Sequence, residues 1–366
     1  MNNAPLSKPV YGERVADFVL PTPNNPRFHL NAAAGRNLVL AFLGSSPTPA
    51  AQALIAEART VRAAFDDRLA GLFWVVSKPE HIEQLGIVQD VPGIRYFMDY
   101  EGLAARRYGL VAEGGNDVSP RIFVVDRTLR LLQAIDLQPD RPHLAPIVAG
   151  LRRLDAFQRG QDSLDHAPVL VVERVFEPEL CRLLVDYYNA QGGTPSGFMR
   201  ERDGKTIAML DSGFKRRRDC VIDDARLRAS AMNRIHARLL PEIQRAFQFT
   251  ATRIERHIVA RYDAEEGGFF RPHRDNTTKG TAHRRFAVTI NLNAEDYQGG
   301  DLRFPEFGER TYRAPTGGAV VFSCSLLHEA TEVIAGTRYA YLPFLYTDDD
   351  AELRRRNEVF LESRRG

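Results

Sequence analysis

The chain has 366 residues, a length that favours two domains because a typical domain holds about 150 residues. Its 49 basic and 47 acidic side chains nearly cancel, which argues against a protein built to bind nucleic acid or another polyanion. With 44% hydrophobic and 26% charged residues, the composition excludes wholesale disorder and a collagen-like structure, and no stretch reaches the roughly 18 apolar residues that a transmembrane helix needs.

The first half of the chain alternates short apolar runs with stretches of helical composition. Continuous apolar runs bounded by turn residues are typical of buried strands. Strands are predicted at residues 38–43, 72–76, 122–126 and 129–135, and helices at 49–69 and 144–157. The last two strands are close enough to form a hairpin. This order predicts an α/β layer with a mixed sheet.

A different pattern follows. Residues 158–167 are polar and lack periodicity, so we expect a linker there. Residues 178–188 and 224–247 have the spacing of amphipathic helices. Between residues 254 and 346, short strands alternate with glycine-bearing turns, which predicts a β-sandwich or barrel.

These patterns divide the chain into four parts. We expect a first domain at 1–157, a linker at 158–167, a second domain at 168–347 and a charged tail at 348–366.

The cysteines bear on the cellular compartment. Cys181, Cys220 and Cys324 are too few and too scattered for a disulfide framework. Residues 1–10 contain no apolar segment of the kind found in secretory signals. We therefore expect a cytoplasmic protein in a reducing compartment.

A histidine and an aspartate stand two residues apart in the second domain, at His273 and Asp275. Alternate strand residues point to one face, so these side chains can share a metal. A third ligand from a distant strand would complete a set that suits non-haem Fe(II). The spacing alone is weak, because a chain with 9 histidines forms it easily by chance. His328 opens a later strand, and Arg338 stands ten residues beyond it, after Gly336.

The segment from His328 to Arg338 is predicted to be a hairpin. A three-residue loop, 334–336, would keep both side chains on the inner face, whereas a two-residue turn would aim Arg338 outward. We therefore expect an odd-length loop, a positive φ at Gly336, and Arg338 directed into the barrel.

Five segments extend the pattern in a fixed order: RYDAEEGGFFRPHRD (261–275), AVTINLN (287–293), YQGGDLRFPEFG (297–308), TGGAVVFS (316–323) and HEATEVIAGTRYAYLPF (328–344). With them, residues 168–346 resemble the 2-oxoglutarate- and Fe(II)-dependent oxygenases of the prolyl 4-hydroxylase type. The resemblance implies a double-stranded β-helix, or jelly roll, with packing helices. It also implies a dioxygenase that hydroxylates a C–H bond while 2-oxoglutarate is decarboxylated to succinate.

The resemblance assigns iron to three side chains: His273, Asp275 and His328. It places the distal carboxylate of 2-oxoglutarate on Arg338, whose guanidinium can hold a carboxylate through two parallel hydrogen bonds. Tyr262 would bind the same co-substrate, although a plain core tyrosine is an equal alternative. Asn291 is expected to face the barrel interior. Besides Fe(II), 2-oxoglutarate and O₂, the resemblance allows ascorbate as a reductant.

Two other features of the second domain allow alternative interpretations. A zinc hydrolase would need a general base beside the metal, and Glu329 directly follows a ligand on a strand, so it should point the other way. The basic run from Lys215 to Arg218 reads first as a solvated face; as an alternative, it lines a substrate entrance that favours acidic partners.

The first half contains three segments that resemble peroxiredoxins, which have the thioredoxin fold: GERVADFVLP (12–21), DYEGLAARRYGL (99–110) and SPRIFVVD (119–126). The resemblance covers roughly residues 8–155. The family places its reactive cysteine in a Thr-Pro-x-Cys motif at the start of a helix, and this chain has Ala51 there. Thr48 and Arg121 remain. With no cysteine in this domain, thiol peroxidase chemistry is excluded, and a structural or partner-binding domain is expected.

Two functions therefore stand against each other. The first is a 2-oxoglutarate-dependent oxygenase with a redox-inactive thioredoxin-like domain, and the alternative is a non-enzymatic binding or sensor protein that retains both folds. The complete set of His273, Asp275, His328 and Arg338 favours the enzyme. The substrate, a protein or a small molecule, is not readable because substrate-selecting loops carry no transferable code. We expect no membrane partner, and the sequence leaves a homodimer open.

Overall fold

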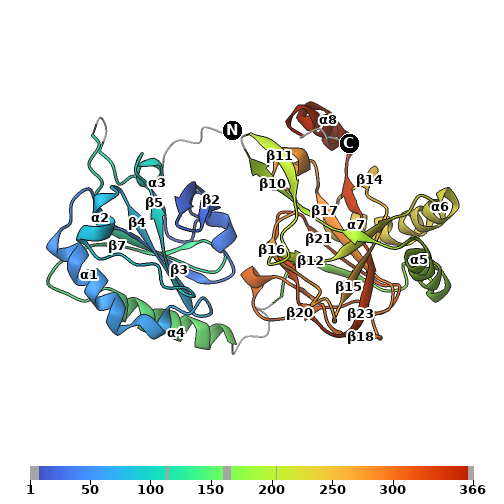
Figure 1. Cartoon of the computed structure of the whole chain (residues 1–366), viewed down its shortest axis with the longest axis horizontal. Helices are drawn as coiled ribbons and strands as arrows, with labels where there is room; N and C mark the ends of the chain where they lie inside the picture. The colour runs from blue at the N-terminus through green and yellow to red at the C-terminus, as the bar shows by residue number, and fades with distance from the viewer. Residues whose placement is uncertain (1–7, 113–114, 160–165, 203, 362–366) are drawn as a thin grey trace. The chain divides into compact units, whose positions relative to one another are not determined.

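The computed structural model describes residues 8–112, 115–159, 166–202 and 204–361 (Figure 1). The chain divides into two compact units, Met1–His166 with Pro305–Gly308 and Ala167–Phe304 with Glu309–Gly366. Most of the predicted linker, residues 160–165, lies outside the described residues. In the described part of the chain, no helix has both the length and the apolar character needed to cross a membrane.

The first unit is built on a five-stranded sheet in the order β5-β4-β3-β6-β7. Its central strands β3 and β4 are parallel, whereas β6 runs antiparallel to β3 and forms the predicted hairpin with β7. The elements are β1 (Val19–Thr22), β2 (Asn25–His29), β3 (Asn37–Phe42), α1 (Pro49–Thr60), β4 (Ala70–Val76), α2 (Glu80–Gln84), β5 (Ile94–Met98), α3 (Leu103–Arg107), β6 (Arg121–Val125), β7 (Leu131–Asp136) and α4 (Leu144–Arg159). This is a thioredoxin-like α/β fold, as predicted.

Burial on both faces explains the apolar runs of this sheet. Every residue of β3 and β4 is buried. Helices α1 and α4 pack against each other and cover one face (Figure 1). On strands β4 and β5, Phe73 and Phe97 stack with ring centroids 5.1 Å apart, and Phe18 meets Phe97 edge to face. Fully burying one such ring contributes roughly 2 kcal/mol.

The second unit consists of two sheets and packing helices. Its helices and early strands are β8 (Leu170–Val172), α5 (Pro178–Gln191), β9 (Thr194–Pro195), β10 (Phe198–Arg202), β11 (Lys205–Met209), β12 (Lys215–Arg216), β13 (Arg218–Val221), α6 (Ala225–Arg234), α7 (Leu240–Phe247) and α8 (Asp348–Asn357). The later strands are β14 (Arg253–Glu255), β15 (Ile258–Asp263), β16 (Phe269–His273), β17 (Phe286–Asn291), β18 (Tyr297–Gly299), β19 (Leu302–Arg303), β20 (Thr311–Tyr312), β21 (Ala319–Ser323), β22 (His328–Ala330), β23 (Val333–Tyr341) and β24 (Phe344–Tyr346).

The larger sheet contains ten strands along the path β14-β24-β17-β23-β15-β13-β9, with β18, β21 and β8 off this path. The smaller sheet has the order β12-β16-β22-β19-β20. Helices α5, α6 and α7 bury their apolar side chains, among them Leu184, Ala231 and Ile243, in one core with the larger sheet. The unit is a double-stranded β-helix with packing helices, as predicted.

The predicted helix over 224–247 is interrupted. A π-helical turn, Ile235–Leu239, separates α6 from α7. Pro241 stands in the first turn of α7 and has no backbone N–H to continue the α-helical ladder, which accounts for the break.

The predicted hairpin from His328 to Arg338 is wrong. Strand β22 belongs to the smaller sheet and β23 to the larger one, so the chain crosses between sheets after Ala330. Gly336 has the expected positive φ, 74°, for a different reason. It lies within β23 opposite Tyr297 of β18, and a side chain on it would stand 2.4 Å from the carbonyl oxygen of Asp296.

Candidate metal centre

Three predicted ligands come together on the smaller sheet. His273 at the end of β16 is paired with His328 at the start of β22. The register of this strand pair is irregular between Phe270 and His273. Asp275 follows in a loop, where its own backbone N–H donates to the carbonyl oxygen of Cys324 at 3.0 Å. The geometry thus comes from one strand pair and one anchored loop.

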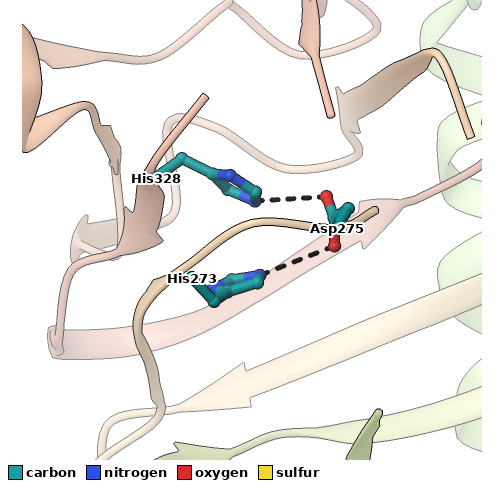
Figure 2. Close-up of side chains that lie close together, drawn as sticks. All are labelled: His273, Asp275 and His328. Carbon is teal, nitrogen blue, oxygen red and sulfur yellow. Dashed lines mark ion pairs between the residues drawn. The ribbon is translucent and has the colours of Figure 1, made fainter. Parts of the chain in front are cut away.

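The carboxylate lies between the two imidazoles (Figure 2). Its Oδ1 is 3.7 Å from His273 Nε2, and its Oδ2 is 3.3 Å from His328 Nε2. One nitrogen or oxygen atom from each of the three residues lies within 4.8 Å of the others. Among the described residues, this is the single group of three such side chains close enough to share a metal ion.

The opposite ring nitrogens fix how each imidazole is protonated. His273 Nδ1 lies 2.8 Å from the carbonyl oxygen of Arg271, and His328 Nδ1 lies 3.0 Å from that of Leu326. A carbonyl oxygen can only accept, so both Nδ1 atoms carry the proton. Nε2 is then the ring nitrogen that faces the carboxylate, and in a neutral ring its lone pair is the one that can bind a metal.

Electrostatics keep the carboxyl group of Asp275 ionised. Burial alone would raise the pKa of Asp275, but attraction to and a hydrogen bond with His328 outweigh it and hold the pKa low. Burial, aided by His328, lowers the pKa of the His273 imidazole. A carboxylate beside neutral imidazoles is the donor set that a divalent metal needs.

Aromatic rings support both histidines. The Phe270 ring stacks on His273 with centroids 3.5 Å apart, and Phe322 lies 4.5 Å from the His328 ring. These contacts restrict both rings and keep one side of the site apolar.

Arg338 and Tyr262 lie on the larger sheet, where they are directly paired between β23 and β15. Arg338 is 2% exposed and Tyr262 is 3% exposed. The guanidinium carbon of Arg338 lies 5.0 Å from the centre of the Tyr262 ring. Within the described residues, Nε and Nη1 of Arg338 have no hydrogen-bond partner. Such a buried, unpaired cation calls for an anion.

Other residues were placed differently from the expectations or missed. Asn291 is buried as expected, but its amide donates to the carbonyl of Ala314 at 2.6 Å, a structural role. The sequence patterns did not single out Tyr297, which lies close enough to Arg338 to feel its charge. Burial raises the pKa of the Tyr297 hydroxyl, although the positive charge of Arg338 opposes the shift. Glu329 pairs with Arg303 Nε at 2.5 Å, in keeping with a side chain that points away from the ligands.

The basic run is not a solvated face. Lys215 and Arg217 are buried, whereas Arg216 is exposed and Arg218 half-buried. The alternation is that of a strand, and it directs two cations inward. Strand parity could have revealed this pattern.

The first unit has no thiol site. Ala51 is fully buried, and its N–H donates to the Thr48 hydroxyl oxygen, which caps α1. Arg121 is ion-paired with Asp136 at 3.0 Å. All three cysteines of the chain lie in the second unit, where they are buried and free.

Comparison with known proteins agrees with this geometry. Residues 257–346 match the model of the 2OG-Fe(II) oxygenase superfamily. Similar solved structures include a Trichoplax adhaerens prolyl hydroxylase in complex with a hypoxia inducible factor peptide fragment (15% identity, 56% of this chain and 95% of that chain, TM-score 0.39). Another is a Pseudomonas putida prolyl-4-hydroxylase (18%, 51% and 96%, 0.38). A third is the reduced 2-Cys peroxiredoxin of Plasmodium vivax (10%, 41% and 98%, 0.34).

The second unit is thus an oxygenase domain of the 2OG-Fe(II) superfamily, as predicted from its motifs. The chain thus carries a domain of the 2-oxoglutarate-dependent oxygenases together with a unit of thioredoxin-like α/β fold. The residues present fit both groups that the family uses: a two-histidine, one-carboxylate set suits Fe(II), and the unpaired donors of Arg338 suit a carboxylate of 2-oxoglutarate.

Proposed function

We propose that the protein hydroxylates a C–H bond of its substrate, in the manner of prolyl 4-hydroxylases. Fe(II) would be held by His273, Asp275 and His328, and 2-oxoglutarate by Arg338 and Tyr262. The observation that carries the proposal is the buried Arg338 on the larger sheet of the jelly roll, two of whose nitrogens have no hydrogen-bond partner among the described residues. The smaller sheet of the same jelly roll bears the cluster of His273, Asp275 and His328.

The side chains have distinct tasks. Asp275 supplies a negative charge, while the two histidines supply neutral nitrogen donors. Arg338 binds and orients the distal carboxylate through its fork. The rings of Phe270 and Phe322 limit access of water to the histidines. When bound, iron together with 2-oxoglutarate and O₂ supplies the oxidising power, and succinate and CO₂ are released; ascorbate would keep the iron reduced.

The first unit serves as a structural or partner-binding element in this proposal. Its helix α1 begins at the place where a peroxiredoxin would carry its thiol, but Ala51 offers no reactive atom. The substrate is a protein side chain or a small molecule that reaches the second unit.

The test is a screen for hydroxylation. The whole chain is incubated with Fe(II), 2-oxoglutarate and O₂ and with pools of peptides or metabolites. The expected product gains one oxygen atom, and isotope labelling traces that atom to O₂. Succinate should appear in equal amount. Fe(II) and 2-oxoglutarate binding without any oxidised product across the pools would instead favour the binding or sensor protein.

A further inference from the structure

Arg217 is a buried cation that the iron and 2-oxoglutarate sites leave unexplained. It stands between β12 and β13 and is 7% exposed. A cation at such a place needs hydrogen-bonded partners, because an isolated buried charge is costly. Its partners therefore indicate its task.

Asp219 fixes the position of the guanidinium. Arg217 Nη2 donates to Asp219 Oδ2 at 2.7 Å, and Nε lies 2.7 Å from Oδ1. Ser196 Oγ accepts from Nη2 at 3.1 Å and donates to Asp219 Oδ2 at 2.5 Å. Burial would raise the pKa of Asp219, but the charge of Arg217 outweighs burial and lowers it to about 2. The pair is thus ionised and joined by one hydrogen bond and a second close contact.

The remaining nitrogen reaches the predicted co-substrate site. Arg217 Nη1 donates to the Tyr262 hydroxyl oxygen at 3.3 Å. The guanidinium carbon lies 5.8 Å from the centre of the Tyr262 ring, whose other cationic neighbour is Arg338 at 5.0 Å. No residue in the described ranges accepts a hydrogen bond from the Tyr262 hydroxyl. Its proton is available to a ligand.

We propose that Arg217 is a positioning residue for 2-oxoglutarate that acts through Tyr262. By donating to the hydroxyl oxygen, it occupies one acceptor position and directs the O–H toward the carboxylate on Arg338. A phenol that accepts from a cation is also a stronger donor, since hydrogen bonds in a chain polarise one another. The inference rests on the proposed function, because it takes Arg338 and Tyr262 as co-substrate ligands.

The experiment is a double-mutant cycle read by binding. With O₂ excluded, 2-oxoglutarate is titrated calorimetrically into the Mn(II)-loaded whole chain. Arg217→Lys keeps the charge beside Asp219 but is a single point donor without the fork. Tyr262→Phe should weaken binding about tenfold through loss of one hydrogen bond to a charged group. Arg217→Lys should weaken it about fivefold through loss of polarisation.

The cycle separates action through Tyr262 from direct action. In the Tyr262→Phe background, Arg217→Lys should change the affinity no further. An equal loss in both backgrounds, or no loss in either, would overturn the inference. If Arg217→Lys does not fold, the double variant Arg217→Gln with Asp219→Asn, which removes both charges, is measured in its place.

The matched control is Arg216→Lys, at the neighbouring but exposed position, which should leave the affinity unchanged. Unaltered Mn(II) affinity in every variant shows that the metal centre is intact. Failure of the unmodified protein to bind 2-oxoglutarate at all overturns the proposed function, and this inference with it, before any Arg217 variant is measured.

Discussion

The two units differ in whether they retain the reactive side chains that their family resemblances imply. The first retains the sheet, the helix α1 and its Thr48 cap, but the fully buried methyl group of Ala51 stands where the family resemblance requires a thiol. The second retains its two histidines, which are paired on the smaller sheet, the aspartate that follows the first of them in a loop, and a buried arginine on the larger sheet. A fold therefore does not predict activity; the reacting atoms have to be traced residue by residue.

Two buried carboxyl groups, one in each unit, respond to burial in opposite ways. In the first, Asp99 caps α3 through the N–H groups of Ala104 and Ala105, and burial raises the pKa of its carboxyl group. In the second, Asp219 has a pKa lowered to about 2 because Arg217 outweighs the effect of burial. Among the described residues, the first unit has no group of three side chains that could hold a metal ion.

The largest expected effect is loss of metal binding in His273→Ala. Removing one of three ligands should weaken Mn(II) or Fe(II) binding at least about a hundredfold, since even residues that only orient ligands can cost that much. Calorimetric titration measures it, and His236→Ala, an exposed histidine on the π-helical turn, is the control. Unchanged affinity in His273→Ala would sink the ligand assignment.

Next in size is the effect of Arg338→Met on the co-substrate. Loss of a buried guanidinium that holds a carboxylate should raise the KM for 2-oxoglutarate about a hundredfold, with metal affinity unaltered. Arg338→Lys keeps the positive charge but loses the two parallel donors of the guanidinium, so its KM for 2-oxoglutarate should lie between those of Arg338→Met and the unmodified protein. Equal KM values for the two variants and the unmodified protein would remove Arg338 from the site.

Acid should distinguish Asp219 from Asp99. A carboxyl group whose pKa is lowered on folding stabilises the fold above its unfolded pKa of about 4 and loses that contribution as the pH falls toward 2. For Asp219 the difference amounts to about 2 kcal/mol. Asp219→Asn should lower the free energy of unfolding at neutral pH and flatten its decline between pH 5 and 2.

Asp99 has the opposite sign. Because its pKa is raised, ionisation opposes folding, so its contribution favours the fold at low pH and weakens as the pH rises through the raised pKa. Asp99→Asn should therefore not flatten the acid decline. The same pH dependence of stability in both variants would contradict the contrast between Asp219 and Asp99.

The smallest effect is expected in the first unit. The unmodified protein should show no thiol-dependent peroxide consumption, because its cysteines are buried, and burial raises the pKa of Cys181 to about 12. Ala51→Cys should not restore it, since position 51 is fully buried and Arg121 is already paired with Asp136. Turnover with a thioredoxin-type reductant in Ala51→Cys would show that the site is dormant rather than lost.

Short-range periodicity predicted the α/β layer and the barrel, whereas the family resemblance, and not periodicity, added the distant His328 to the ligand set. The parity of His273 and Asp275 and the positive φ of Gly336 are local properties. The hairpin failed because parity assigns a residue to a face but not to a sheet, and β22 leaves its sheet after only three residues.

Charges inside strands were the other obstacle. Strand β5 escaped prediction because Arg95 interrupts its apolar pattern, and that charge is compensated by two hydrogen bonds to the distant Asp67. Lys215 and Arg217 were likewise predicted to be part of a solvated face, because the sequence alone does not show the partners that compensate a buried charge. Their partners, Ser196 and Asp219, become apparent only once the strands are paired.

The central claim is that the second unit alone carries an iron- and 2-oxoglutarate-dependent active site. Succinate formation from 2-oxoglutarate by the whole chain, with Fe(II) and O₂, tests it most directly. We expect succinate from the unmodified protein and from Ala51→Cys, and none above background from His328→Ala. No succinate from the iron-loaded protein, or undiminished succinate from His328→Ala, would contradict the account.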